Sequence, residues 1–349
     1  MPGGSRLRSW VWCALWLPAL GSAQALASDR VDVIPHDAER RVDILVGGKP
    51  FTAYIYPTTL KKPTLYPVRA ASGTVVTRGW PIDPRPGERV DHPHQVGVWF
   101  DYGNVNGFDF WNNSDAIPAD HAGQMGTILH RAVRRAESGT GAGTLEVTAE
   151  WVGPHGMALV REETRFVFRA APGVRAIDRI TTLKALVTAV TFKDDKEGLL
   201  GLRVARALEQ PSTTPEVFTD ALGHATSVPV LNNAGVTGHY RSSEGFEGDA
   251  VWGTRGRWTM LSGSVAGEPL TIAILDHPAN VGFPTYWHAR GYGLFAANPL
   301  GVKAFTNGKA ELNFRLAPGQ TTTFRYRILI LSGAATPEEI ETRYQDFAR

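Results

Sequence analysis

Apolar and polar residues alternate over long stretches of the chain, which is the pattern expected of strands. Side chains of an extended strand point to opposite faces in turn, so one apolar face can be buried while the other meets water. The segments 143–154, 157–170 and 174–186 alternate in this way, with Gly and Pro between them. Their lengths and spacing predict an antiparallel meander.

Strand patterns also occur on both sides of this meander. Residues 31–35 and 41–57 predict a hairpin region with Gly47 and Gly48 at its turn. Further strand-like segments cover 74–80, 189–208, 257–263, 269–278, 292–299, 309–319 and 321–333. Residues 208–250 are less regular and rich in Ser, Thr, Asn and Gly, which predicts long loops.

One helix is predicted, at the C-terminus over residues 336–349. Thr336 and Glu339 have capping-box spacing, with Pro337 at the first helical position. Ile340 and Tyr344 share a face with Phe347, and we expect this face to dock on a sheet.

The order of these elements predicts an all-β fold. Strands do not alternate with helices, which disfavours a doubly wound sheet. We expect a large antiparallel β-sandwich with long loops and one C-terminal helix, formed as a single domain over residues 28–349.

The first residues have the layout of a secretory signal peptide. Arg6 and Arg8 precede a short apolar run, and small residues near Ala25 offer a cleavage site. We therefore expect a signal peptide over 1–27 and a periplasmic or extracellular location. The single cysteine, Cys13, lies inside this segment, so the mature chain is expected to have neither a disulfide nor a cysteine nucleophile.

Charge and hydropathy disfavour two classes of partner. The formal charge is +2, and losing Arg6 and Arg8 with the leader brings it to about zero. No basic cluster remains, which argues against nucleic acid as a partner. After residue 28 no apolar run approaches the ~18 residues needed to cross a bilayer, so no transmembrane segment is expected after cleavage.

The stretch 91–111 has the densest group of chemically useful side chains. As a strand, its first half would aim His92 and His94 at the same volume. Its second half is a polar loop that leads into aromatic residues. Candidate substrate-binding residues in this stretch are Trp99, Asn104, Asn106 and Trp111. The alternative is two unrelated histidines in a strand and loop with partly buried aromatics.

Two further segments contribute candidates. The charged turn 193–198 contains Lys196 and Glu197, and Arg203 follows inside an apolar strand, where a charge needs a partner. The segment 276–301 contributes His277, Trp287, His288 and Arg290. Aromatic rings beside His and Arg suit a pyranose, whose apolar face stacks while its hydroxyls take hydrogen bonds. A solvated turn and an aromatic rim of the core are the corresponding structural alternatives.

Several chemistries remain open at this point. His92, His94 and His288 are candidate ligands of a divalent metal. A carboxylate pair for glycoside hydrolysis could come from Asp101, Asp109, Glu197 and Asp276, and their spacing does not choose among them. Serine contexts lack the strand-turn-helix setting of a hydrolase nucleophile.

Three long segments together resemble a known family. They are HPHQVGVWFDYGNVNGFDFW (92–111), DDKEGLLGLRVA (194–205) and LDHPANVGFPTYWHARGYGLFAANPLG (275–301). In this order they are similar to the PmoA-like family of exported bacterial proteins of unknown function, often labelled methane oxygenase PmoA. The family pattern is closer to D-T-K-E-G, so the dipeptide Asp194-Asp195 departs slightly from it. The resemblance covers the chain from Arg41 to its C-terminus.

The resemblance implies a body similar to the supersandwich of galactose mutarotases. Methane oxidation is disfavoured, because the subunit that the label refers to is a multi-helix membrane protein. Our leading hypothesis is an exported carbohydrate-active enzyme, a lyase, epimerase or hydrolase, that acts on a sugar or polysaccharide fragment. Catalytic candidates for general acid/base chemistry are His92, His94, Glu197 and His288. A non-catalytic carbohydrate-binding or scaffold protein and a metal-dependent oxidoreductase are the alternatives.

Overall fold

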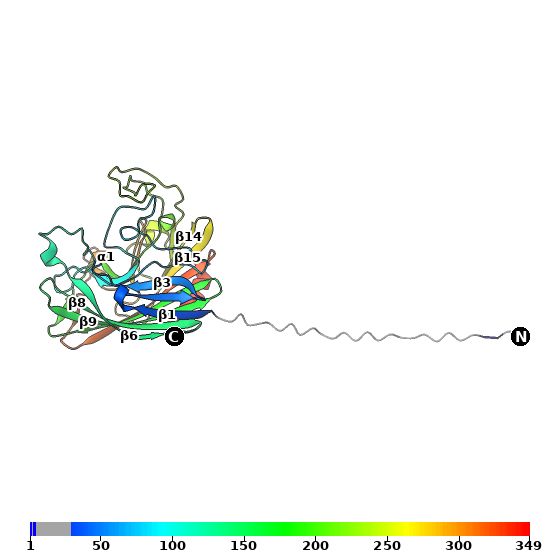
Figure 1. The fold of residues 1–349 in the computed structure, drawn as a ribbon, viewed down its shortest axis with the longest axis horizontal. Helices are drawn as coiled ribbons and strands as arrows, with labels where there is room; N and C mark the ends of the chain where they lie inside the picture. The colour runs from blue at the N-terminus through cyan, green and yellow to red at the C-terminus, as the bar shows by residue number, and fades with distance from the viewer. Residues whose placement is uncertain (2, 5–28) are drawn as a thin grey trace.

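The computed structural model describes residues 1, 3–4 and 29–349, and it places two antiparallel sheets face to face (Figure 1). The nine-stranded sheet contains, in order, β16 (Tyr286–Arg290), β17 (Leu294–Asn298), β12 (Gly198–Arg203), β5 (Val98–Tyr102), β4 (Thr64–Leu65), β3 (Lys49–Ile55), β2 (Arg41–Val46), β1 (Arg30–His36) and β7 (Gly139–Thr140). The eight-stranded sheet contains β13 (His239–Ser242), β14 (Trp258–Val265), β15 (Glu268–Asp276), β19 (Thr321–Ser332), β10 (Val174–Ala185), β9 (Ala158–Ala171), β8 (Ala142–Val152) and β6 (Thr127–Glu137). The predicted antiparallel β-sandwich is confirmed.

The smaller elements lie mainly in the connections. They are β11 (Val190–Phe192) paired with β18 (Phe314–Leu316), the 3-10 turns η1 (Asp37–Glu39), η2 (Ala122–Gln124), η3 (Arg206–Leu208) and η4 (Gly248–Val251), and the short helix α1 (Val302–Phe305).

The core fills the space between the sheets because the strands alternate as the sequence predicts. One continuous apolar cluster includes residues from Val31 on β1 to Ile330 on β19. The predicted meander forms β8, β9 and β10, which pair in sequence order. Gly47 and Gly48 turn β2 into β3 with φ of +56° and +76°, values that favour glycine.

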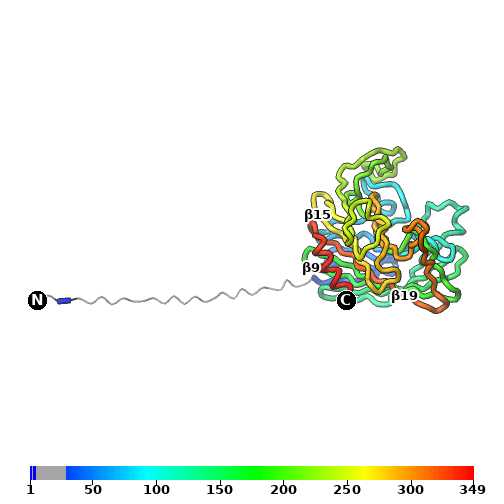
Figure 2. The backbone as a smooth tube through the Cα atoms, turned by 180° about the vertical axis from the view of Figure 1, so that it is seen from behind, coloured from blue at the N-terminus to red at the C-terminus, as the bar shows by residue number. Residues whose placement is uncertain are grey.

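The C-terminal helix α2 (Pro337–Ala348) covers part of the outer face of the eight-stranded sheet. Thr336 accepts from the backbone N–H of Glu339, and the Glu339 side chain accepts from the backbone N–H of Thr336, so the predicted capping box is present. Ile340 and Tyr344 are buried in a cluster with residues of β14, β15 and β19. Figure 2 shows α2 in red next to β15.

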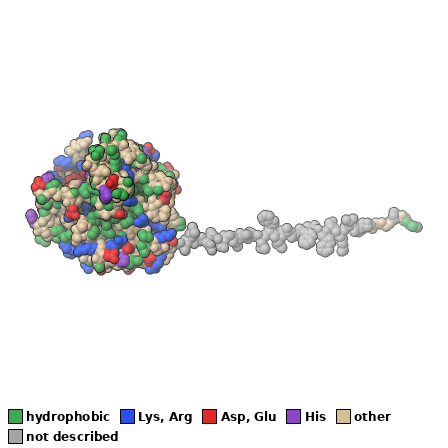
Figure 3. Space-filling view, turned by 45° about the horizontal axis from the view of Figure 1, so that its top comes forward, with side chains coloured by type: hydrophobic (Ala, Val, Ile, Leu, Met, Phe, Trp, Pro, Cys, Tyr) green, Lys and Arg blue, Asp and Glu red, His purple; other side chains and the backbone are tan. Residues whose placement is uncertain are grey.

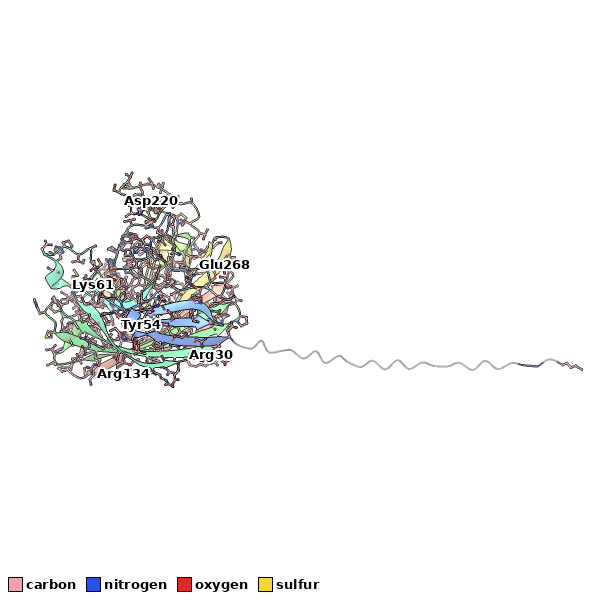
Figure 4. All side chains as sticks on the ribbon, in the orientation of Figure 1. Arg30, Tyr54, Lys61, Arg134, Asp220 and Glu268 are labelled. Atoms are coloured by element: carbon pink, nitrogen blue, oxygen red, sulfur yellow. The ribbon has the colours of Figure 1, made fainter. Side chains whose placement is uncertain are left out.

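Long loops gather at one end of the sandwich, and Asp220 lies at the tip of one of them (Figure 4). The segment 208–250 is mostly loop as predicted, although β13 and η4 interrupt it. Charges of both signs are interspersed over the face seen in Figure 3. Among the described residues, no helix combines the length and apolar character that crossing a bilayer requires. Of the predicted signal peptide, the structure describes only residues 1, 3 and 4.

Candidate functional site

Four neighbouring strands place a row of residues on the outer face of the nine-stranded sheet. The strand register aligns Trp99 of β5, Gly201 of β12, Ala296 of β17 and His288 of β16. Neighbouring strands lie about 4.8 Å apart, so three steps separate Trp99 from His288 by about 14 Å. The two small residues between them leave room for the Trp99 indole, which lies over Gly201. The candidate side chains form two groups beside this row, and the Tyr292 ring lies between them, stacked on His92 and 6.0 Å from the Arg290 guanidinium.

The first group is built on a turn rather than on the predicted strand. The backbone N–H of Gln95 donates to the carbonyl of His92 at 3.0 Å, and β5 begins only at Val98. Pro93 lacks the N–H that a central strand position needs, which explains the error. The imidazoles of His92 and His94 still meet, with ring centroids 5.7 Å apart. His92 has φ of +45°, a strained value of the kind that clusters at functional sites.

Two buried arginines hold this turn in place. Arg78 donates to the carbonyl oxygens of Asp91, His92 and Gln95 at 2.9, 3.0 and 3.1 Å, and to the Asp91 carboxylate at 2.5 Å. Arg203 donates to the same carboxylate and to the Gln95 side chain, both at 2.6 Å. Burial alone would raise the pKa of Asp91, but Arg203, His92 and Arg78 hold it well below its usual range. Asp91 is therefore a fixed negative charge beside His92.

His92 lies between a carboxylate and an aromatic ring. Its Nδ1 is 3.2 Å from Oδ2 of Asp91, and its ring stacks on Tyr292 with centroids 4.8 Å apart. The Arg203 guanidinium lies 4.8 Å from the same Tyr292 ring. The His92 side chain remains 40% exposed, so it is the part of this group that a solute can reach.

His94 is buried in surroundings that disfavour its charged form. Burial, together with the positive charges of Lys62, His92, Arg203 and Arg78, lowers the pKa of His94 to about 2. Its Nε2 finds no hydrogen-bond partner within the described part of the chain. The side chain lines a cavity of about 380 Å³, a size typical of ligand pockets. Polar groups of this cavity come from Lys62, Thr64, His94 and Asn113, and Trp80 supplies an indole.

A buried ion pair lies beneath this cavity. The Lys62 ammonium is 2.5 Å from Asp101 and donates to the carbonyl of Trp111 at 2.6 Å. Burial raises the pKa of Asp101 to about 7, against the opposing effect of Lys62. Trp99 and Trp111 pack edge to face with centroids 5.1 Å apart. Both indoles are fully buried, so they support the site from below and are not exposed to a substrate, contrary to their prediction as substrate-binding residues.

The second group lies at the β16 end of the row. His288 is buried, and its Nδ1 lies 2.9 Å from the carbonyl of Lys196 and 3.8 Å from Glu197. Burial lowers the pKa of His288 to about 4, although Glu197 opposes this shift. Lys196 is exposed and contacts Glu197, and the Arg290 guanidinium lies 5.5 Å from the Trp252 ring. His288 and Arg290 are two positions apart on β16 and therefore lie on the same face of the sheet.

Four of the candidate residues lie outside both groups. Asn106 bonds the backbone of Ala189 and Thr191, and Asn104 accepts from Gly107, so these amides stabilise a loop. The remaining two candidates occupy other faces of the sandwich. His277 packs against Phe347 of α2, and Trp287 points into the core because it alternates with His288. We therefore leave these four residues out of the candidate site.

The geometry gives little support to a metal site. Among the described residues, no group of three His, Asp, Glu or Cys side chains is placed to bind a metal ion. His288 belongs to the second group and directs Nδ1 at a carbonyl. Positive charges surround His94 and would repel a cation.

The sequence did not reveal Lys62, Arg78 and Gln95, and it gave Asp91 no role. A buried partner of Asp101 could have been predicted, because Asp101 is a carboxylate inside the apolar strand VWFDY. Nothing in the sequence near Lys62 identifies it as that partner, since 39 positions separate the two.

The chain belongs to a family described as Family of unknown function (DUF6807), whose profile matches residues 41–345. A search of curated proteins finds no significant match.

Three solved structures are similar at low identity. The galactosidase domain of the α-galactosidase–sucrose kinase AgaSK matches at 11% identity and a TM-score of 0.37, over 86% of this chain and 42% of that chain. GH36 α-galactosidase AgaB from Geobacillus stearothermophilus matches at 9% identity and a TM-score of 0.40, over 86% of this chain and 41% of that chain. HI1317 matches at 10% identity and a TM-score of 0.32, over 86% of this chain and 99% of that chain. The chain spans about two-fifths of the length of the two α-galactosidases. Likeness of this degree says nothing about activity or substrate.

Proposed function

We propose that this protein is an enzyme that acts on a carbohydrate by general acid/base chemistry at the His92 and His94 group. The observation that carries the proposal is the setting of His92. Its imidazole is accessible, has a strained backbone, lies 3.2 Å from a permanently charged Asp91 and adjoins an uncharged His94. An imidazole oriented by a carboxylate is a common proton carrier in enzymes.

The two histidines have different roles in this proposal. His92 accepts or donates the proton, because its ring is accessible and Asp91 lies 3.2 Å from its Nδ1 and orients it. His94 remains neutral and holds a substrate oxygen by a hydrogen bond, as a neutral imidazole with a lowered pKa can. Arg203 and Arg78 add positive charge nearby, which stabilises negative charge that develops on the substrate.

The lining of the cavity favours a sugar. Lys61, Ser114 and Asp115 offer polar contacts to hydroxyl groups at the rim of the cavity, and the Trp80 indole offers an apolar face for stacking. The donors of Lys62, Thr64 and Asn113 are used within the protein. The Nε2 of His94 is buried without a partner, and a hydroxyl could satisfy it once the side chain shifts toward the cavity that it lines. A substrate in this cavity contacts His94 and reaches toward His92.

The second group supplies further contacts in the proposal. Glu197 and His288 form a second candidate acid/base pair, and Lys196 with Arg290 binds hydroxyl or carboxylate groups at the rim. Export, the resemblance to PmoA-like proteins and the choice among lyase, epimerase and hydrolase all remain predictions. A protein that binds sugar without turnover is the rival, and the experiment below separates the two.

The test compares His92→Asn with a matched control. His224 is also next to an aspartate, with Nδ1 3.5 Å from Asp220, but it lies on an exposed loop. Wild type, His92→Asn and His224→Asn are incubated with a panel of oligosaccharides, and the products are identified by mass spectrometry. The proposal expects turnover by wild type and His224→Asn, and a loss of about 10²- to 10⁴-fold in His92→Asn. Equal turnover by all three proteins would refute the role of His92. Binding without turnover in the wild type would support the rival.

A further inference from the structure

We propose that a second cavity next to the first binds additional sugar units, so that the ligand is an oligosaccharide longer than a disaccharide. This inference rests on the proposed carbohydrate function and adds a binding site to it. The cavity has a volume of about 540 Å³ and lies beside the segment 56–63 and the start of β6. Both cavities are lined by Leu60, Lys61 and Lys62. A ligand that continues past this shared wall passes from one cavity into the other.

An ordered aromatic stack lies in the wall of the second cavity. Tyr56 stacks on His130 with ring centroids 3.8 Å apart and an interplanar angle of 26°. The His130 ring is itself fixed, because its Nδ1 is 3.1 Å from the hydroxyl of Tyr54. Burial lowers the pKa of His130 to about 4, so the stack is uncharged at neutral pH. Both Tyr56 and His130 line the cavity and remain partly exposed. An aromatic ring held in this way suits the apolar face of a sugar.

Polar groups of both signs surround the stack. Asp37 and Arg40 line the same cavity from the turn before β2. Lys61 is paired with Asp115, and Arg131 is paired with Glu150 at 2.9 Å. Arg40 has no ion-pair partner within residues 29–349, so its guanidinium is available to hydroxyl groups. Mixed charges around an aromatic ring favour a neutral polyol over a strongly charged ligand.

The arrangement of the two cavities gives the ligand a direction. Lys61 marks their shared wall, and Tyr54 anchors the stack on the sheet below it (Figure 4). The first cavity takes the sugar unit that contacts His94, and the second cavity takes the units beyond Lys61. Binding at the second cavity therefore depends on chain length, whereas contact with His94 does not.

The test measures affinity as a function of chain length in Tyr56 variants. The probes are β-1,4-linked hexasaccharides of glucose, xylose, mannose and galactose, together with the matching disaccharides, measured by isothermal titration calorimetry on the full chain. For at least one sugar, we expect wild type to bind the hexasaccharide more tightly than the disaccharide. Tyr56→Ala should weaken hexasaccharide binding roughly tenfold and leave disaccharide binding unchanged. Tyr56→Phe keeps the stack and should bind like wild type.

Three controls keep the outcome decisive. Arg134→Ala, three positions beyond Arg131 on β6 but outside the lining of both cavities, should leave both affinities unchanged. Thermal unfolding of Tyr56→Ala separates loss of fold from loss of binding. If the alanine variant does not fold, Tyr56→Leu, which fills the space without an aromatic ring, replaces it with the same expected loss. With wild type, hydrogen–deuterium exchange should show protection of 56–63 and 127–131 by the bound hexasaccharide alone.

Equal affinity for the two lengths, no binding of any hexasaccharide, or no protection of these segments would overturn the inference. The failure of the proposed function looks different. In that case His92→Asn would retain full turnover, or wild type would show no turnover at all, while the length dependence at Tyr56 persisted.

Discussion

Gly201 is the position where one methyl group should disturb the site from below. A Cβ at Gly201 would overlap with Cε2 and Cζ2 of the Trp99 indole. Trp99 cannot move away easily, because it is fully buried against Trp111 and the Lys62 side chain. Gly201→Ala should therefore force a rearrangement of the floor under the cavity.

The size of the effect follows from two opposing contributions. Overpacking a tight core costs about 1–3 kcal/mol. Replacing glycine by alanine restricts the unfolded chain and returns about 0.4–1 kcal/mol. Because the Trp99 site is fully buried, we take the upper part of the first range. The expected net loss in the free energy of unfolding is about 2 kcal/mol.

The assay is urea unfolding followed by far-ultraviolet circular dichroism, with Gly123→Ala as the matched control. A Cβ at Gly123 meets no atom within 4 Å, so that variant should be neutral or slightly stabilised. Trp99→Phe in the Gly201→Ala background should relieve the overlap and give a favourable coupling of about 1 kcal/mol in a double-mutant cycle. Equal stability of Gly201→Ala and Gly123→Ala, or no coupling, would refute the described packing.

Two further predictions concern the histidine turn. Arg78→Met leaves the carbonyls of Asp91 and Gln95 without their donor and should lower the free energy of unfolding by about 3 kcal/mol in urea. The control is Lys184→Met at an exposed strand position, which should change the free energy of unfolding by less than about 0.5 kcal/mol. An equally small change in Arg78→Met would contradict the prediction. The pKa of His94 is about 2 in the folded protein and about 6.5 in the unfolded chain. Its contribution to the free energy of unfolding is therefore fully present above about pH 6.5 and is lost as the pH falls. His94→Gln should therefore remove about 1.4 kcal/mol per pH unit from the slope of stability between pH 6 and 5, and an unchanged slope would count against a neutral His94.

Much of the fold follows from local pattern. The capping box at Thr336 and Glu339 sets the start of α2 because all of its hydrogen bonds lie within four residues. The alternation in β8, β9 and β10 predicts the meander because each strand has one buried face. The prediction of a strand at His92 was wrong, because period-two spacing in a short segment does not distinguish a strand from a turn.

The site was predictable only where its partners are close in sequence. His92 and His94 are two positions apart, so their proximity needed no knowledge of the fold. The pairing of Arg203 with Asp91 spans 112 positions, and only the strand order brings the two together. Trp287 shows the same limit, because alternation predicts that it opposes His288 but does not say which of the two faces the core.

The most direct test of the central claim is a kinetic cycle between Asp91 and His92 on a substrate found in the oligosaccharide screen. If Asp91 acts by orienting His92, turnover by the double variant Asp91→Asn/His92→Asn should equal that of His92→Asn alone, about 10²- to 10⁴-fold below wild type. Circular dichroism of each variant confirms that the fold is retained. Independent, multiplying losses from the two substitutions, or turnover by His92→Asn at the wild-type rate, would contradict the account.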